Sequence, residues 1–441
     1  MKIVYLAAGA AGMYCGSCLH DNTLAAALSA AGDDVLLVPT YTPLRTDEPN
    51  VSIGRVFLGG VNVYLQQVAP VFRHTPRWLD AMLDWPVLIR RVSRRNAAID
   101  PAKLGALTVS VLRAEDGNQR KEVRRLVDWL HREVRPDVVH LSNSMLIGLA
   151  APLGRRLQVP VVCSLSGEDI FLEKLSEPHR TRARRLIGQG AAEVAAFVAM
   201  NHYFAGYMAD YMQIGRERIQ VVPHGLNLVG HGQRPKPLKR ESFTIGYLAR
   251  ICPDKGLHLL VDAFLQLAAD QALPPIRLHV AGYLGAGDRS YLEQLTKKID
   301  KAGLQSRFRY HGELNREEKI AFLQSLDVMS VPTVYRESKG IPVLEAWANA
   351  VPVVEPAHGC FPELIADTGG GMLCDPENPT ALAAALKQLI LDPAAADQYG
   401  RNGQAAVRAR YHAGAMAEKT RQLYQTLTGA HVENVPHHSA G

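Results

Sequence analysis

The sequence predicts an α/β protein of two doubly wound domains, and three observations support this prediction. The chain has 441 residues and is 47% hydrophobic, whereas a single core rarely grows beyond about 250–300 residues. Short apolar strands alternate with amphipathic helices along most of the chain, which is typical of parallel sheets covered by helices. A polar, basic and proline-bearing segment at 229–241 interrupts the alternation, and such a composition is typical of a linker between domains.

We therefore expect an N-terminal domain over residues 1–228, the linker at 229–241 and a C-terminal domain over residues 242–410. A further helix at 411–428 is expected to pack back on the N-terminal domain. The tail at 429–441 is expected to be flexible, because chain ends without packing partners are poorly ordered. No repeat of 20–50 residues is present, so a solenoid is not predicted.

The N-terminal domain is expected to begin with a buried strand at 2–8, a glycine loop and an alanine-rich helix at 22–31 closed by a glycine. A strand at 34–39 completes the first strand–loop–helix–strand unit of a parallel sheet. Short strands are also predicted at 51–56 and 61–67. The same alternation then predicts strands at 137–141, 159–165, 195–200 and 219–223, and helices at 122–134, 145–157, 180–188 and 203–213.

The C-terminal domain restarts the pattern with a strand at 243–248 and a helix at 257–270. A helix beginning near Pro342 is expected because proline suits the first helical turn. The remaining expected strands are 277–281, 308–311, 328–331 and 352–355, and the remaining helices are 290–302, 317–326, 362–366, 381–391, 394–410 and 415–427.

Charge and cysteine content narrow the partners and the compartment. The formal net charge is +6, which favours anionic ligands or a membrane surface over nucleic acid. Six cysteines are too sparse for a disulfide scaffold, so we expect a cytoplasmic protein. We expect a monomer or a homodimer. The apolar N-terminus continues into a glycine loop without a clear cleavage site, which disfavours a signal peptide, and no apolar run is long enough to span a bilayer.

The region 70–104 mixes aromatic residues with a basic cluster at Arg90, Arg91, Arg94 and Arg95. Two interpretations are open. An interfacial helix would place the protein at the inner face of the membrane, in peripheral contact with anionic lipid. A helical cap on the domain core with a solvated basic edge would explain the same residues by ordinary packing.

The segment from Glu337 to Glu345 is the first candidate functional element. A helix start offers free N–H groups and a positive dipole end, which suit a phosphate. Gly340 would let a ligand approach the backbone. The two carboxylates would then lie on either side for hydroxyl groups, although a solvated Glu and a capping Glu at a helix start are also common.

Two cations lie just past the first strand of the same domain. Arg250 and Lys255 are expected at the carboxyl edge of the sheet, where ligands of open parallel sheets bind. The chain has no Asp-x-Asp sequence, so a diphosphate would be neutralised by these cations and by the helix start, with no metal or other cofactor. A solvated Arg and a Lys-Gly turn are the alternative.

These residues belong to a longer pattern. The motifs are G-Y-L-A-R-I-C-P-D-K-G (246–256), V-A-G (280–282), H-G-E-L (311–314), Glu-x7-Glu (337–345) and Pro362-Glu363. They resemble those of the retaining glycosyltransferases of family 4, which have the GT-B fold of two Rossmann-like domains facing a cleft. The resemblance covers most of residues 243–391, and V-V-P-H-G-L-N (221–227) and G-G-V-N-V-Y-L (59–65) extend it weakly into the first domain.

The resemblance implies a hexosyltransferase that uses a nucleotide-diphosphate sugar and acts on a sugar, lipid or small-molecule acceptor. Arg250 and Lys255 would bind the diphosphate, Glu337 would contact the sugar hydroxyls and Glu345 the ribose. The backbone of Gly340, Ile341, Val343 and Leu344 would cradle phosphate, with Gly12 of the first glycine loop as a further donor-binding residue. A nucleotide-sugar epimerase, a phosphorylase and a non-catalytic nucleotide-sugar-binding protein are the alternatives.

The acceptor side departs from the family pattern. Ser166 stands where the family often has histidine, and Glu168 and Asp169 follow it. We expect these three residues, with Asp21 and Asn22 on the loop of the first domain, to contact the acceptor.

Cys15 and Cys18 form a C-G-S-C sequence between a strand and a helix. Three interpretations stay open at this point: a redox pair with a lowered thiol pKa, a zinc site with His20, or plain lining of the loop near the acceptor.

Overall fold

The computed structural model describes the chain in two compact units. Unit 1 comprises residues 1–225 and 413–441, and unit 2 comprises residues 226–412. The described residues are 1–9, 15–59, 63, 66–67, 104–232 and 242–434. Gly12, the aromatic and basic region at 70–103 and most of the expected linker, from 233 to 241, lie outside the described residues.

Unit 1 is built on a six-stranded parallel sheet with the order β2-β1-β3-β4-β5-β6. The strands are short apolar runs, because helices cover both faces and no polar face is needed. In β1, for example, every residue after Ile3 is fully buried. The strands are β1 (Lys2–Ala7), β2 (Asp34–Pro39), β3 (Val138–Leu141), β4 (Val161–Ser164), β5 (Ala196–Ala199) and β6 (Ile219–Val221).

Two segments of unit 1 differ from the prediction. The segment 51–56 is not a strand, because only Ser52 bridges to β2, through Leu37. In the segment 61–67, the described residues Val63, Gln66 and Gln67 are helical instead of extended. The α-helices that lie wholly among the described residues of unit 1 are α1 (Gly16–Ala30), α5 (Gly105–Leu112), α6 (Arg120–Trp129), α7 (Ala150–Leu157), α8 (Asp169–Glu173), α9 (His179–Gly190), α10 (His202–Met212) and α18 (Ala413–Asn434).

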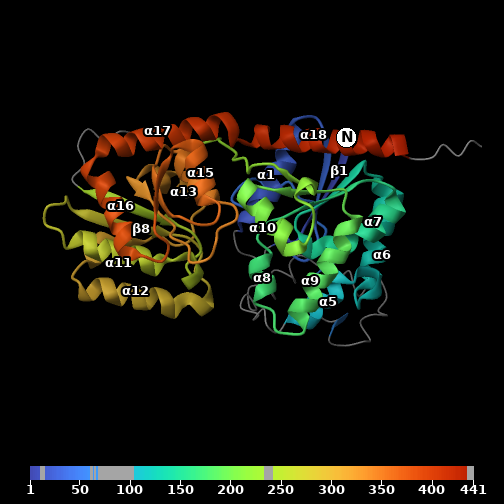
Figure 1. The fold of residues 1–441 in the computed structure, drawn as a ribbon, viewed down its shortest axis with the longest axis horizontal. Helices are drawn as coiled ribbons and strands as arrows, with labels where there is room; N and C mark the ends of the chain where they lie inside the picture. Colours follow the sequence, from blue (N-terminus) through green and yellow to red (C-terminus); the bar gives the residue numbers. More distant parts are fainter. Residues whose placement is uncertain (10–14, 60–62, 64–65, 68–103, 233–241, 435–441) are drawn as a thin grey trace, which may run out of the picture. The chain divides into compact units, whose positions relative to one another are not determined.

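The C-terminal helix α18 is part of unit 1, where it packs along α1 (Figure 1). The Tyr424 hydroxyl lies 2.5 Å from Nδ1 of the buried His140 in β3, and Arg421 pairs with Asp33 at 3.2 Å. The last segment of the chain is thus tied to the first strands of the same unit. α18 also continues to Asn434, beyond the Gly429 at which we expected a flexible tail to begin.

Unit 2 has a second six-stranded parallel sheet with the order β12-β11-β10-β7-β8-β9. Chain order reverses between β7 and β10, as it does in the doubly wound dinucleotide-binding fold. The strand β12 was not predicted, because its glycine-rich sequence is typical of a loop. The strands are β7 (Phe243–Leu248), β8 (Ile276–Ala281), β9 (Phe308–Tyr310), β10 (Val328–Met329), β11 (Val353–Pro356) and β12 (Gly371–Cys374).

The helices of unit 2 follow the strands in alternation. α11 packs against α16, and α14 packs against α17. The indole of Trp347 in α14 is fully buried there and donates to the carbonyl of Gly370 at 2.7 Å. The helices are α11 (Leu257–Ala268), α12 (Arg289–Lys301), α13 (Arg316–Gln324), α14 (Ile341–Ala348), α15 (Phe361–Thr368), α16 (Pro379–Leu391) and α17 (Pro393–Arg410).

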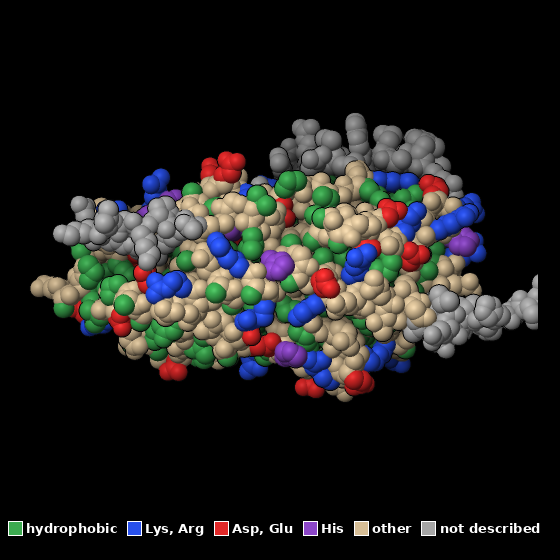
Figure 2. Space-filling view, turned by 90° about the horizontal axis from the view of Figure 1, so that it is seen from above, with side chains coloured by type: hydrophobic (Ala, Val, Ile, Leu, Met, Phe, Trp, Pro, Cys, Tyr) green, Lys and Arg blue, Asp and Glu red, His purple; other side chains and the backbone are tan. Residues whose placement is uncertain are grey.

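The distribution of charged side chains on the surface is consistent with the modest net charge of the chain. On the face seen in Figure 2, Lys and Arg side chains are interspersed with Asp and Glu side chains. Within the described part of the chain, none of the helices combines the length and the apolar character that crossing a bilayer requires.

Candidate active site

The candidate site of unit 2 lies where the chain order of its sheet reverses. Ligands of doubly wound sheets bind at such a point, outside the carboxyl ends of the strands. The loop after β7 carries Arg250 and Lys255, and the loop after β10 carries Glu337. Because β7 and β10 are neighbours, these two loops meet at the same edge.

Lys255 and Glu337, which are far apart in sequence, form an ion pair at this edge. Lys255 Nζ lies 2.7 Å from Glu337 Oε2. The Tyr335 hydroxyl donates to the same oxygen at 2.8 Å and accepts from Lys255 Nζ. The ammonium also lies 4.8 Å from the centre of the Tyr335 ring, within the range of a cation–π contact.

The other oxygen of Glu337 is held by the backbone. Oε1 accepts from the N–H groups of Ser338 and Lys339, each at 3.1 Å. Burial alone disfavours the charged carboxylate, but the charge and hydrogen bond of Lys255, with the bonds from Tyr335 and Lys339, outweigh it and lower the pKa of Glu337 to about 2. Glu337 is therefore a fully ionised, pre-oriented carboxylate at neutral pH.

This lowered pKa predicts a stability difference that depends on pH. A carboxylate with a depressed folded-state pKa stabilises the fold above its ordinary pKa, and this contribution is lost as the pH falls through the folded value. The stability advantage of the wild type over Glu337→Gln should be complete above pH 4.5 and should shrink toward pH 2. Urea unfolding of both proteins from pH 6 to pH 3 measures the difference. An advantage that stays constant over this range would contradict the prediction.

The loop after β7 is anchored by the strand that precedes it. The buried Tyr247 hydroxyl lies 3.1 Å from the carbonyl oxygen of Arg250 and 3.4 Å from that of Lys255. Arg250 itself is exposed, and its Nε donates to Cys252 Sγ at 3.3 Å. The guanidinium therefore belongs to the same loop as Lys255, and one of its donors is bonded to Cys252.

Glycine is required at two points of this edge. Gly256, which follows Lys255, has a φ of 72°, and a Cβ there would lie 1.7 Å from the carbonyl oxygen of Pro332. Gly340, which precedes α14, has a φ of 68°, and a Cβ would lie 2.5 Å from Cδ1 of Leu364. Both conformations favour glycine, and at Gly256 the loop after β7 lies close to the backbone of the loop after β10.

The start of α14 offers fewer free backbone N–H groups to a phosphate than we predicted from the sequence. The N–H groups of Val343 and Leu344 donate to the carbonyl of Gly340, at 3.0 Å and 3.2 Å, and both side chains are buried. These two amides therefore belong to the first turn of the helix. The amides of Gly340 and Ile341, which precede that turn, are left as the candidate phosphate donors.

Glu345 is paired with a lysine that the sequence motifs did not indicate. Lys319 of α13 places Nζ 2.5 Å from Glu345 Oε1, and both residues are buried. A signal was present in the sequence: Lys319 lies on the same helix face as Ile320, Phe322 and Leu323. A lysine within an apolar face needs a carboxylate partner.

A third buried carboxylate, Glu355 of β11, was not predicted from the sequence either. Both of its oxygens accept from the N–H of Val331 in the loop after β10, at 3.1 Å and 3.2 Å. Burial, with a smaller contribution from the charge of Glu337, raises the pKa of Glu355 well above its usual range. Burial thus favours the protonated form of Glu355, which supports the loop that carries Glu337.

In unit 1, Asp21 and Asn22 were wrongly placed on a loop. α1 begins at Gly16, so both residues lie inside the helix and are buried. Asp21 accepts from the Tyr5 hydroxyl at 2.9 Å, and Asn22 bonds the backbone of Pro49 and Val51 at 3.0 Å and 2.9 Å. Their polar groups are engaged within the unit.

Ser166, Glu168 and Asp169 do lie together, after the carboxyl end of β4. The buried Glu168 accepts from the N–H groups of Ser144 and Ser166, at 2.9 Å and 2.6 Å, and so fixes this turn. Burial and the charge of Glu168 raise the pKa of Asp169 to about 6. Asp169 therefore changes charge near neutral pH.

Within the C-G-S-C sequence, the pKa of the Cys18 thiol is shifted upward, opposite to the lowered value expected of a reactive redox thiol. Cys15 caps α1 and is half-buried, and Cys18 is buried one turn inside. The hydrogen bond with Cys15, together with burial, raises the pKa of the Cys18 thiol. His20 Nδ1 lies 2.9 Å from Nδ1 of His224, and no group of three or more potential metal ligands is found among the described residues.

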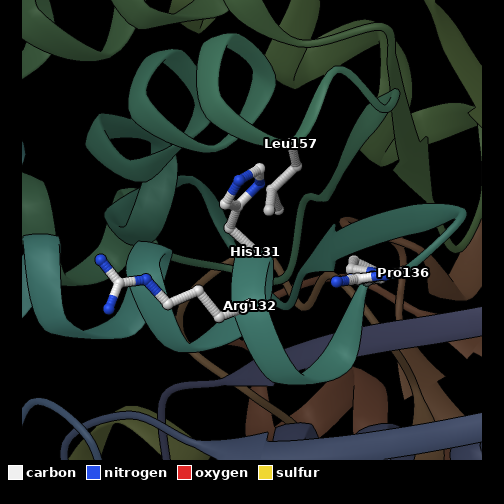
Figure 3. A pocket seen from close by; sticks show the side chains of 5 residues that line it. His131, Arg132, Pro136 and Leu157 are labelled. Carbon is white, nitrogen blue, oxygen red and sulfur yellow. The ribbon is translucent and has the colours of Figure 1, made fainter.

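A separate pocket lies in unit 1 between the π-helical turn Leu130–Val134 and α7. Figure 3 shows that the side chain of Arg132 points away from His131, and that His131 points toward Leu157. His131 and Arg132 therefore point in different directions in this pocket. It is lined by His131, Arg132, Arg135, Pro136 and Leu157.

Comparison with known proteins identifies the family to which the chain is similar. The family model of the glycosyl transferases group 1 matches residues 232–406, and that of Glycosyltransferase Family 4 matches residues 107–229. The chain is 23% identical to glycogen synthase of Mycobacterium tuberculosis, over 92% of this chain and 89% of that protein. It is 27% identical to D-inositol 3-phosphate glycosyltransferase of Arthrobacter sp., over 78% of this chain and 84% of that protein.

Solved structures share the fold. Anabaena HepE in complex with UDP has a TM-score of 0.67 at 18% identity, over 97% of this chain and all of that one. Sucrose-phosphate synthase of Thermosynechococcus elongatus has a TM-score of 0.69 at 18% identity, over 98% of this chain and all of that one. The predicted fold class is confirmed: the chain belongs to the glycosyltransferases of family 4, with the two Rossmann-like domains of the GT-B fold.

Proposed function

We propose that the protein is a retaining glycosyltransferase that moves a hexose from a nucleotide-diphosphate sugar to an acceptor hydroxyl without a metal ion. One observation carries the proposal: Lys255 and Glu337 meet at 2.7 Å where the chain order of the sheet reverses. A cation for phosphate and an ionised carboxylate for sugar hydroxyls thus stand side by side. Of the structural relatives, HepE was solved with UDP and with UDP-glucose.

The cations would hold the diphosphate of the donor. Lys255 exchanges its contact with Glu337 for one with phosphate, and the exposed Arg250 supplies a second charge from the same loop. The amides of Gly340 and Ile341 at the start of α14 complete the anion site. These groups neutralise the negative charge that grows on the diphosphate as it leaves, which is the largest demand of the reaction.

The two carboxylates would hold the rest of the donor. Glu337 accepts from hydroxyls of the transferred sugar, and Glu345 accepts from the ribose. The bond from the anomeric carbon to the diphosphate oxygen breaks as the bond to the acceptor oxygen forms on the same face. The acceptor proton passes to the departing phosphate oxygen, so a strong protein base is not required.

The acceptor, a sugar, a lipid or a small molecule, would meet the turn after β4 in unit 1. Ser166 offers a half-buried hydroxyl group there, and Asp169 offers a carboxyl group whose pKa of about 6 lets it accept or donate near neutral pH. Glu168 supports both residues by fixing the turn.

A donor panel tests the proposal. Thermal unfolding of the full-length protein with UDP-, GDP- and ADP-hexoses, with EDTA present, should show stabilisation by one of them. At 100 times the dissociation constant the expected gain is about 2.7 kcal/mol. Transfer to an acceptor would then be followed by NMR, where a product that keeps the anomeric configuration of the donor is expected.

Two outcomes would contradict the proposal. If no nucleotide sugar of the panel stabilises the protein, the proposed transferase function is wrong. Stabilisation that needs a divalent cation, or a product of inverted configuration, would overturn the metal-independent, retaining mechanism and leave the donor site in place.

A further inference from the structure

The buried ion pair between Lys319 and Glu345 lies at the ligand edge of the sheet. Lys319 is in the first turns of α13, which begins at Arg316 after β9, and Glu345 is in the first turns of α14, which begins at Ile341 after β10. Helices that follow parallel strands start at the carboxyl edge of the sheet. The pair therefore stands close to the edge that carries Glu337 and Lys255.

The two oxygens of the Glu345 carboxylate have different surroundings. Oε1 lies 2.5 Å from Lys319 Nζ. Within the described part of the chain, Lys319 is the one side chain that bonds this carboxylate, and it does so through Oε1. Oε2 is therefore left to accept from a ligand, on a carboxylate whose other oxygen is held by the lysine.

Stability alone gives little reason for this arrangement. Removing two charges from water is costly, and an apolar pair of similar volume is often equally stable or more stable at such a position. Lys319 has apolar neighbours on its own helix face, including Ile320 and Leu323. A charged pair at this place is more easily explained by a ligand that uses the carboxylate.

We propose that Lys319 is a positioning residue for the donor nucleotide: it orients Glu345 so that Oε2 accepts a ribose hydroxyl. This inference rests on the proposed function, in which Glu345 meets the ribose. Lys319 does not touch the nucleotide. It acts by fixing the direction of the free oxygen of Glu345.

The test compares two ligands that differ only in the ribose. The first is the nucleoside diphosphate that stabilises the wild type most in the donor panel, and the second is its 2′,3′-dideoxy analogue. Calorimetric titration of the full-length wild type should show binding of the first that is at least about tenfold tighter, since a bond to a charged group is lost with the hydroxyls. Lys319→Met should weaken the first ligand by a similar factor and leave the second within about twofold.

Further variants separate positioning from a structural role. Glu345→Gln, which keeps the shape and removes the charge, should show the same ribose-specific loss, and Lys319→Arg should restore most of the affinity. In turnover, Lys319→Met should raise KM for the donor and leave kcat nearly unchanged. Lys387→Met, which breaks a half-buried pair with Asp270 in the same unit, is the matched control and should alter neither ligand.

The outcomes distinguish this inference from the proposed function. A wild type that binds no nucleotide overturns both. A wild type that binds the ribonucleotide and its dideoxy analogue equally overturns the role of the pair and leaves the donor site standing. Equal weakening of both ligands in Lys319→Met, and again in Glu345→Gln, would show a structural role and overturn the positioning role.

Discussion

Replacing Glu337 with glutamine is expected to lower sugar transfer by about 10²-fold or more, which is the usual effect of removing one pre-organised charged group from a transition state. Glutamine keeps the shape of the side chain but cannot act as the anion that Lys255 and Tyr335 now hold. The loss should appear in kcat, measured as initial rates at saturating donor, because the sugar hydroxyls lose their acceptor while the diphosphate clamp remains.

A matched control for this variant is Glu317→Gln. Glu317 is an exposed residue of α13 in the same unit, and its replacement should leave turnover unchanged. Circular dichroism and thermal unfolding should show that Glu337→Gln is folded. Turnover of Glu337→Gln equal to that of the control would remove the role assigned to Glu337.

Replacing Lys255 with methionine is expected to have an equally large effect, on donor binding as well as turnover. The variant loses the cation at the diphosphate and leaves Glu337 without its counter-ion. Breaking a buried pair costs about 3–5 kcal/mol, and we expect the lower end, because the Lys255 side chain keeps 20% of its exposure. Urea unfolding at pH 7 measures this cost, and calorimetry with the nucleoside diphosphate measures the affinity.

The double variant Lys255→Met with Glu337→Gln separates the two consequences. It removes the unpaired charge as well as the cation, so stability should return toward that of the wild type while donor affinity and turnover stay low. A double variant that is no more stable than Lys255→Met would show that the two residues are not coupled. Recovery of donor affinity in the double variant would count against Lys255 as a diphosphate ligand.

The positions of the main groups of unit 2, at one edge of its sheet, could be predicted from the sequence. Arg250 and Lys255 follow one predicted strand and Glu337 follows another, and the rule for parallel sheets brings such residues together. This works because the strands β7 and β10 are short, apolar and clearly bounded. Their carboxyl ends can therefore be located to within a few residues.

The partners of these groups could not be predicted in the same way. Tyr335 and Lys319 bond the two carboxylates, but neither has a sequence spacing that indicates the contact. Lys319 reaches Glu345 only because the folded chain brings the first turns of α13 and α14 close together. Such long-range pairs depend on helix packing, which local periodicity does not contain.

Unit 1 shows where local patterns mislead. Asp21 and Asn22 are buried polar residues inside α1, so the helix lacks the apolar stripe that would have marked its first turns. In unit 2, the glycines at the start of β12 made the segment resemble a loop, although it pairs with β11 along its whole length. In both cases the tertiary partner, Tyr5 for Asp21 and β11 for β12, overrides the local signal.

The amino-acid sequence is sufficient to assign the fold class, the presence of two domains and the edge of the C-terminal sheet that carries Glu337. Strand and helix periodicity and the motif from Glu337 to Glu345 are local properties, so they can be read along the chain. The packing of the folded chain decides that Lys255 bonds Glu337, that Lys319 bonds Glu345, and that α18 belongs to unit 1. These contacts join residues far apart in sequence, and the burial and ion pairing that shift the pKa of Glu337 exist only once the chain has folded.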